Sequence, residues 1–154
     1  MKKILVVVAA VLMSMSMSAQ IDNDYLELTR EILKVEKKAA VAEAMQLSDA
    51  DSQPFWTLYN EYQSALYLVQ NKRVDIIRNF SSNYESISDE KADDLMLASM
   101  KYEQELQKLK GKYYKKFKKI IPAGKAARFM QLENKIETLV DAQLALEIPL
   151  IDAK

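Results

Sequence analysis

The chain has 154 residues, with 22 basic and 22 acidic side chains, no histidine and no cysteine. The lack of cysteine excludes disulfides and thiolate metal sites, and the lack of histidine removes the commonest metal ligand and the usual general base. Gly111 and Gly124 are the only two glycines. A sheet fold with many tight turns needs more glycine than this, so the composition favours helices.

The first twenty residues have the layout of a bacterial secretory signal peptide. Lys2 and Lys3 precede an apolar run at residues 4–13, and the segment ends in Ser18-Ala19-Gln20. Such a run is too short to span a bilayer stably. We therefore predict export across the inner membrane to the periplasm, without stable membrane insertion. The mature chain, residues 21–154, is expected to be one all-helical domain with 20 basic and 22 acidic side chains, a net charge of −2.

Four amphipathic stretches follow, and the first two lie between residues 24 and 83. The first runs from about residue 24 to residue 45, with apolar residues at spacings of three and four: Tyr25, Leu28, Ile32, Val35, Ala39 and Ala42. The second starts after Ser48, a good N-cap followed by Asp49 and Asp51, and ends at the polar residues 81–83. Its stripe consists of Phe55, Leu58, Tyr62, Leu66, Val69, Arg73, Ile76 and Phe80.

The third and fourth stretches begin after Ser88 and near Pro122, and the fourth ends before Pro149. The third carries Leu95, Ala98, Met100, Tyr102, Leu106, Leu109, Tyr113, Phe117 and Ile120. The fourth carries Phe129, Leu132, Ile136, Leu139, Val140 and Leu144. The predicted fold is all-α. Helices this long and thin leave apolar side chains uncovered at their ends. Dimerisation or an extended hairpin shape would bury these side chains, so we expect a homodimer.

The helix starts resemble one another, since Leu47, Ile87 and Ile121 each precede a cap or helix-start residue. Together with the signal peptide, the pattern over residues 42–146 resembles the Spy/CpxP family of periplasmic proteins, which has Leu-Thr-x-x-Gln segments at helix starts. Here serine or proline stands in place of threonine, and Asp51, Lys91 and Lys125 stand where glutamine is expected. The resemblance implies a curved antiparallel homodimer of helical hairpins, with ATP-independent chaperone activity or envelope-stress sensing.

A basic run at residues 108–119 contains seven lysines interleaved with Tyr113, Tyr114 and Phe117. One interpretation is nucleic-acid binding, with lysines contacting phosphates and aromatic rings stacking on bases. The protein is expected to be exported, however, and the run has no arginine. We therefore predict no nucleic-acid partner. Alternatively, the lysines cover the solvated side of a helix and complement its dipole. A third interpretation, compatible with the second, is a surface that attracts unfolded or acidic chains. The lysines proposed for it are Lys108, Lys112, Lys115, Lys116 and Lys119.

Aromatic residues crowd the start of the second helix. Phe55, Tyr59 and Tyr62 fall on or beside the apolar stripe and are predicted to be core residues. Trp56 and Tyr67 lie off the stripe, which makes them candidates for contact with a partner chain, although half-buried packing is the alternative. Met100 and Tyr114 complete the apolar candidates.

The acidic segment at residues 89–94 holds four carboxylates. They could bind a hard divalent cation weakly or form a solvated, dipole-favoured helix start, and we predict no specific transition-metal site. No Gly-rich phosphate loop and no Ser/His or Cys/His pair can be built from the sequence. We therefore predict no enzyme and no cofactor, while a carboxylate-only hydrolase stays an alternative.

The sequence thus predicts an exported, ATP-independent protein that binds unfolded or partly folded polypeptides through a basic and apolar helical surface. The alternative is a structural or sensory module that binds one specific envelope partner.

Overall fold

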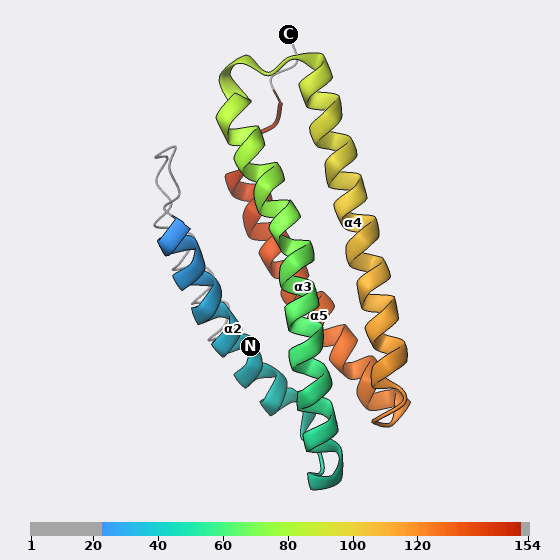
Figure 1. Ribbon diagram of the computed structural model, residues 1–154. Helices are drawn as coiled ribbons and strands as arrows, with labels where there is room; N and C mark the ends of the chain where they lie inside the picture. Colours follow the sequence, from blue (N-terminus) through green and yellow to red (C-terminus); the bar gives the residue numbers. More distant parts are fainter. Residues whose placement is uncertain (1–22, 152–154) are drawn as a thin grey trace. The chain divides into compact units, whose positions relative to one another are not determined.

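The computed structural model describes residues 23–151, with side chains described for residue 31 and residues 33–151. Within this part the chain forms four α-helices, one short 3-10 turn and no strand (Figure 1). The elements are α2 (Asn23–Met45), α3 (Asp49–Asn83), η1 (Tyr84–Ser86), α4 (Asp89–Phe117) and α5 (Ala123–Glu147). The predicted all-α fold is confirmed. The predicted signal peptide lies outside the described residues.

Serine caps start two of the helices, as the sequence predicted. The Ser48 hydroxyl accepts a hydrogen bond from the backbone N–H of Asp51 at 3.3 Å, and Ser88 accepts one from Lys91 at 3.2 Å. Each cap satisfies one of the free amides of a first helical turn. At α5, the backbone N–H of Ala126 donates to the Pro122 carbonyl at 3.0 Å. These local interactions fix where α3, α4 and α5 begin.

Contacts between residues divide the described chain into two compact units. The first contains α2 and residues 128–149, and the second contains residues 48–127 and 150–151, so the division falls within α5.

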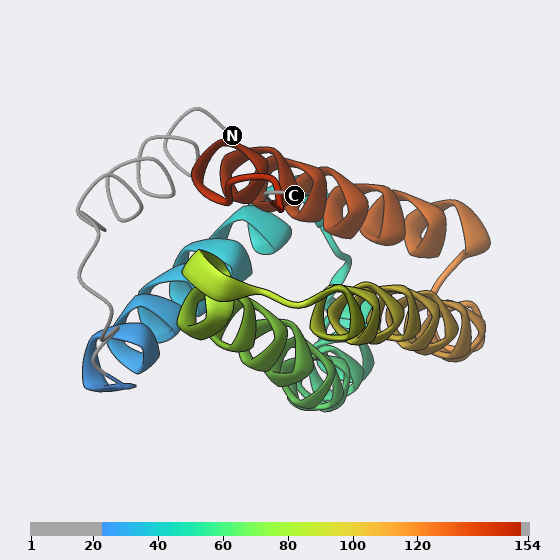
Figure 2. The ribbon, with the colours of Figure 1, turned by 90° about the horizontal axis from the view of Figure 1, so that it is seen from above.

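In the second unit, α3 and α4 lie side by side in both views (Figures 1 and 2). Glu61 near the start of α3 pairs with Lys116 near the end of α4, whereas Lys72 further along α3 pairs with Glu105. The two helices therefore run in opposite directions. Between them lies an apolar core of Phe55, Tyr59, Tyr62, Leu66, Leu95, Tyr102, Leu106, Tyr113 and Phe117.

Among the side chains that the structure describes, fewer are buried in the first unit. Val41 and Met45 of α2 and Phe129 of α5 are buried. Lys37 donates a hydrogen bond to the buried Glu133 carboxylate at 2.7 Å, and Arg128 donates one to the Ala44 carbonyl at 2.8 Å. An ion pair and a helix-end hydrogen bond thus link α2 to α5.

The predicted apolar faces of three helices contain residues that the structure exposes. One is Leu139 of α5, which was assigned to the apolar stripe but is 39% exposed. On α2, Val35, Ala39 and Ala42 are exposed, and the buried face carries Val41 and Met45 instead. The physical reason is that α2 has more than one apolar stripe, and burial of valine and methionine removes more apolar area from water than burial of alanine.

On α4, Met100 is exposed and does not belong to the buried stripe, whereas a lysine further along the helix does. Leu106, Lys110, Tyr113 and Phe117 recur at intervals of three and four, which puts Lys110 on the buried face with 7% of its surface exposed. The lysine run therefore does not lie wholly on the solvated side. Lysine tolerates such a position because its long aliphatic stem packs against apolar neighbours.

None of the helices between residues 23 and 151 combines the length and apolar composition that a membrane span requires.

Candidate functional site

The aromatic rings at the start of α3 are core residues. Phe55 packs against Phe117 of α4 in a tilted arrangement with ring centroids 5.3 Å apart, and Tyr62 packs against Tyr113 at 5.2 Å. Aromatic pairs at such distances stabilise a core beyond the area they bury. Trp56 packs edge-on against Phe55 at 5.1 Å and is half-buried. The prediction of a core role for Phe55, Tyr59 and Tyr62 is confirmed.

A carboxylate on α3 organises the end of α4. Glu61 accepts a hydrogen bond from the Tyr113 hydroxyl at 3.0 Å and one from the Lys116 ammonium group at 2.5 Å. The hydrogen bond from Lys116, and then that from Tyr113, lower the pKa of Glu61 below its ordinary value. Burial and the bond to Glu61 raise the pKa of Tyr113. Lys116 is therefore held by this network, unlike the exposed lysines beside it.

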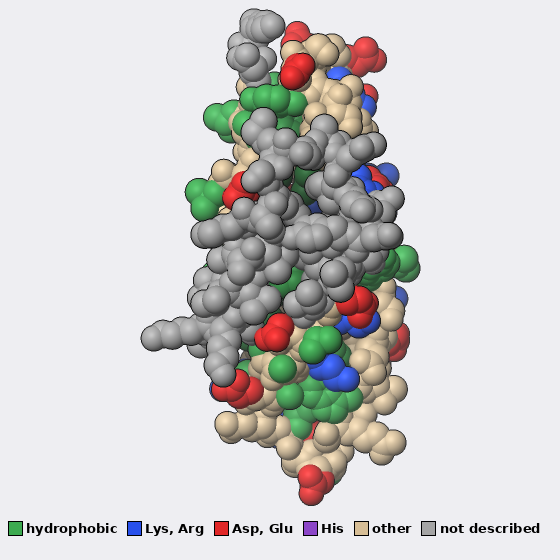
Figure 3. Space-filling view, turned by 90° about the vertical axis from the view of Figure 1, so that its left-hand side faces the viewer, with side chains coloured by type: hydrophobic (Ala, Val, Ile, Leu, Met, Phe, Trp, Pro, Cys, Tyr) green, Lys and Arg blue, Asp and Glu red, His purple; other side chains and the backbone are tan. Residues whose placement is uncertain are grey.

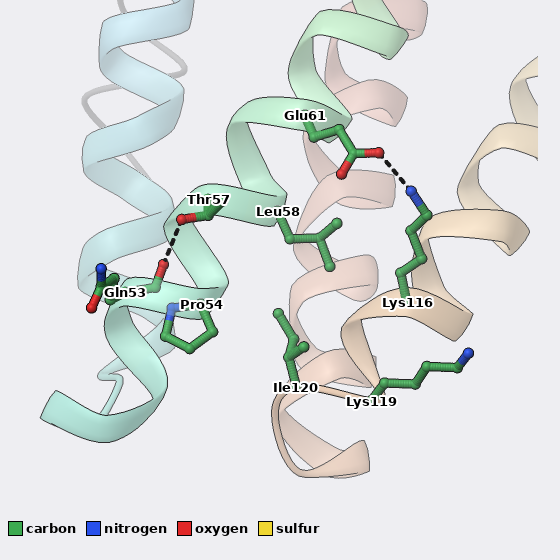
Figure 4. Close-up of a pocket in the computed structure, with 8 residues that line it drawn as sticks. All are labelled: Gln53, Pro54, Thr57, Leu58, Glu61, Lys116, Lys119 and Ile120. Carbon is green, nitrogen blue, oxygen red and sulfur yellow. Dashed lines mark hydrogen bonds and ion pairs between the residues drawn. The ribbon is translucent and has the colours of Figure 1, made fainter.

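Next to this network lies a shallow hollow of about 540 Å³, lined by Gln53, Pro54, Thr57, Leu58, Glu61, Lys116, Lys119 and Ile120 (Figure 4). Leu58 and Ile120 point toward one another across it, and the Glu61–Lys116 pair bounds one side. Lys119 extends outward from the rim. The Thr57 hydroxyl donates to the Gln53 carbonyl at 3.0 Å, within α3. The hollow offers apolar contact beside the Glu61–Lys116 ion pair and the Lys119 side chain.

The predicted lysines divide into two groups. Lys108, Lys112, Lys115 and Lys119 are exposed, whereas Lys116 is bound to Glu61. Ammonium groups also lie over tyrosine rings, with Lys116 at 4.8 Å from the centroid of Tyr113 and Lys118 at 4.8 Å from that of Tyr114. Tyr114 is half-buried, and Lys118 covers part of its ring. The interleaving of lysine and tyrosine therefore has a structural role within α4.

An exposed apolar group lies on the same helix as these lysines. Met96, Leu97 and Met100 are 51%, 55% and 51% exposed. Met96 and Met100 lie one helical turn apart, with Leu97 beside them, on the exposed face of α4, and Lys108, Lys112 and Lys115 lie further along the helix on that broad face. Met100 and Lys108 are separated by about 12 Å along the helix axis. We call the exposed residues Met96, Leu97, Met100, Lys108, Lys112 and Lys115 the outer surface of α4.

Sequence reasoning found Met100 and the lysines of this surface but missed Met96 and Leu97. A partial signal was present, because Met96 and Met100 are one helical turn apart and so share a face, but only the packing of α3 against Leu95 and Tyr102 shows that this face is exposed. Tyr67, by contrast, lies on α3, where it is exposed beside Leu68. Trp56 belongs to the edge of the aromatic core. The predicted apolar residues therefore do not form one surface.

Exposed apolar side chains also occur outside α4. Val35 on α2 and Leu139 on α5 are exposed, and Figure 3 shows a face on which hydrophobic side chains reach the surface among charged ones. On α4, three exposed apolar residues are followed along the same helix by three exposed lysines.

The carboxylates at the start of α4 are exposed: Asp89, Glu90, Asp93 and Asp94. Across the described part of the chain, no group of three or more His, Cys, Asp or Glu side chains is arranged to hold a metal ion.

Comparisons of this chain with family models, curated proteins and solved structures found no significant match.

Proposed function

We propose that this protein is exported and binds unfolded or partly folded polypeptides, without nucleotide and without a catalytic step. The observation that carries the proposal is the outer surface of α4, where exposed apolar side chains are followed by exposed lysines. The pattern of helix starts that resembles the Spy/CpxP family supports the same activity.

The two halves of this surface have different roles in the proposal. Lys108, Lys112 and Lys115 attract acidic or unfolded chains at a distance, and salt screens that attraction over about 10 Å at 0.1 M ionic strength. Met96, Leu97 and Met100 then retain the chain through short-range apolar contact, which salt does not screen. Methionine suits such a role because its flexible side chain adapts to many partners. The hollow beside Leu58 and Ile120 offers a second apolar contact near Lys119.

Light scattering tests the proposal. Several unrelated, chemically denatured proteins are diluted into the purified protein without ATP, at low and high salt. We expect suppression of aggregation for several of these proteins, weaker at high salt. Suppression that does not depend on salt would contradict the electrostatic part. If no denatured protein is protected, the proposal is wrong and a single envelope partner, sought by pull-down, is the better hypothesis.

Matched variants locate the surface. Leu97→Asp with Met100→Asp is expected to reduce capture at every salt concentration, whereas Lys108→Gln with Lys112→Gln reduces it only at low salt. Val35→Asp is the control, because Val35 is an exposed apolar residue on another helix. Equal losses in Val35→Asp and in the α4 variants would argue against a defined surface.

We also propose that the protein is a homodimer built from antiparallel helical hairpins. Exposed leucines at the C-terminal end of the described chain support this, since Leu146 and Leu150 are 81% and 90% exposed. Uncovered apolar groups of this size are commonly buried at interfaces between chains. Sedimentation equilibrium is expected to give twice the chain mass, and Leu146→Asp is expected to lower it. A monomer at micromolar concentration would contradict the proposal.

A further inference from the structure

Within the described part of the chain, the two most exposed methionines lie close together on one helix. The side chains of four methionines are described, namely Met45, Met96, Met100 and Met130. Met45 is 3% exposed and Met130 is half-buried, whereas Met96 and Met100 are each 51% exposed. Met96 and Met100 are four residues apart on α4, so their side chains are neighbours on its surface.

The chain has no cysteine, so methionine thioethers are its sulfur groups open to oxidation. A two-electron oxidant must approach the sulfur atom directly, which favours exposed methionines over buried ones. With hydrogen peroxide, the sulfur lone pair attacks one oxygen, an S–O bond forms and the O–O bond breaks. After proton transfer the second oxygen leaves as water. The thioether is oxidised to a sulfoxide and the peroxide is reduced.

We propose that Met96 and Met100 form a paired oxidation site that controls the outer surface of α4. A sulfoxide is polar and chiral, so oxidation removes most of the apolar character of that surface while Lys108, Lys112 and Lys115 keep their charge. The inference rests on the proposed function, since what is switched off is retention of a bound polypeptide. The buried face of α4, with Leu95, Tyr102 and Leu106, is untouched. Reduction by methionine sulfoxide reductases restores the surface.

Peptide mass mapping decides whether the site exists. The purified protein is treated with hydrogen peroxide for increasing times and digested. We expect one added oxygen on each of Met96 and Met100 well before Met45 is modified, with an unchanged midpoint of thermal unfolding. Oxidation of Met45 as fast as that of Met96 and Met100 would overturn the assignment. This readout does not depend on whether the protein binds polypeptides.

Light scattering decides whether the site is a switch. Oxidised protein is expected to need about fivefold more chain for the same suppression of aggregation, because two apolar contacts are lost. Treatment with reductases specific for both sulfoxide epimers should restore capture. Met96→Leu with Met100→Leu keeps the surface apolar and should make capture insensitive to peroxide. Equal loss of capture in this variant, or full capture by oxidised wild-type protein, would overturn the switch. Failure of the untreated protein to capture anything would instead refute the proposed function.

Discussion

Gln46 is the one residue other than glycine with a positive φ between residues 23 and 151, at 43°. It follows the last residue of α2, where a left-handed residue commonly ends a helix. A side chain makes that conformation costly, and glycine adopts it freely. Gln46→Gly is therefore expected to raise the free energy of unfolding by about 0.5–1 kcal/mol. Urea denaturation measures this, with Gln46→Ala as a control that keeps the strain. A lower midpoint for Gln46→Gly than for Gln46→Ala would contradict it.

The serine caps offer a second test at the same scale. Ser88→Ala removes the acceptor for the Lys91 amide at the start of α4, and we expect a loss of about 1 kcal/mol in stability. Ser88→Asp keeps an acceptor there and adds a charge that the helix dipole favours, so it is expected to retain stability. Comparing the thermal unfolding midpoints of these two variants separates the stability contributed by the cap hydrogen bond from that of the side chain's other contacts. Equal midpoints for the two would show that the cap contributes nothing measurable.

These caps could be predicted from sequence because they depend on residues within one turn. The burial of Lys110 could not, since it depends on which side of α4 faces α3. Met96 and Leu97 were missed for a related reason. The sequence offers several apolar residues from Leu95 to Met100, and the position of the partner helix selects Leu95 for the core and leaves Met96, Leu97 and Met100 exposed.

At the scale of the helix, Gly111 is a position where a substitution should stabilise the protein. It lies inside α4 on the exposed side, and a Cβ added there would meet no atom within 4 Å. Alanine in a helix interior is about 0.5–1 kcal/mol more favourable than glycine. Gly111→Ala should stabilise the protein by that amount in urea denaturation. Gly124→Ala, in the first turn of α5 and equally unobstructed, is the control and should gain less. Destabilisation by Gly111→Ala would mean that another chain approaches α4 closely at this point.

Helix bounds were predicted well, because breakers and caps are local. The buried face was predicted well only where large side chains define it. On α3, Phe55, Tyr62 and Leu66 leave one arrangement that buries the rings. On α2, the alanines between residues 39 and 44 give several stripes of similar weight, so periodicity alone selected the wrong one. Propensity determined that α2 is a helix, but packing determined its orientation.

At the scale of the whole molecule, contacts between distant residues had no sequence signal. The ion pairs of Glu61 with Lys116 and of Asp51 with Lys125 join residues 55 and 74 positions apart. A run of lysines predicts positive charge, but which lysine has a carboxylate partner is set by the packing of α3 against α4. The sequence therefore predicted which residue types make up the candidate surface. The structure shows which of its lysines are bound to a carboxylate and which are exposed.

These ion pairs make the second unit sensitive to acid. Three carboxylates have a lowered pKa, in each case mainly because of a hydrogen bond from a lysine: Asp51 from Lys125, Glu61 from Lys116 and Glu105 from Lys72. Unfolding returns each pKa to its ordinary value, 3.8 for the aspartate and 4.5 for the glutamates. As the pH falls, the unfolded chain takes up these protons first, which favours unfolding. The stabilisation is complete well above 4.5 and is lost as the pH falls through the lower folded pKa values.

The urea midpoint should accordingly fall between pH 6 and pH 3, and Glu61→Gln with Glu105→Gln should make that decline shallower. Because these carboxylates are exposed or partly exposed to solvent, we expect a modest slope, smaller still at high salt. Glu85→Gln is the matched control, since it removes an exposed carboxylate of η1 without removing any of the three ion pairs. A decline in the double variant as steep as in the wild type would mean that carboxylates elsewhere set the acid sensitivity.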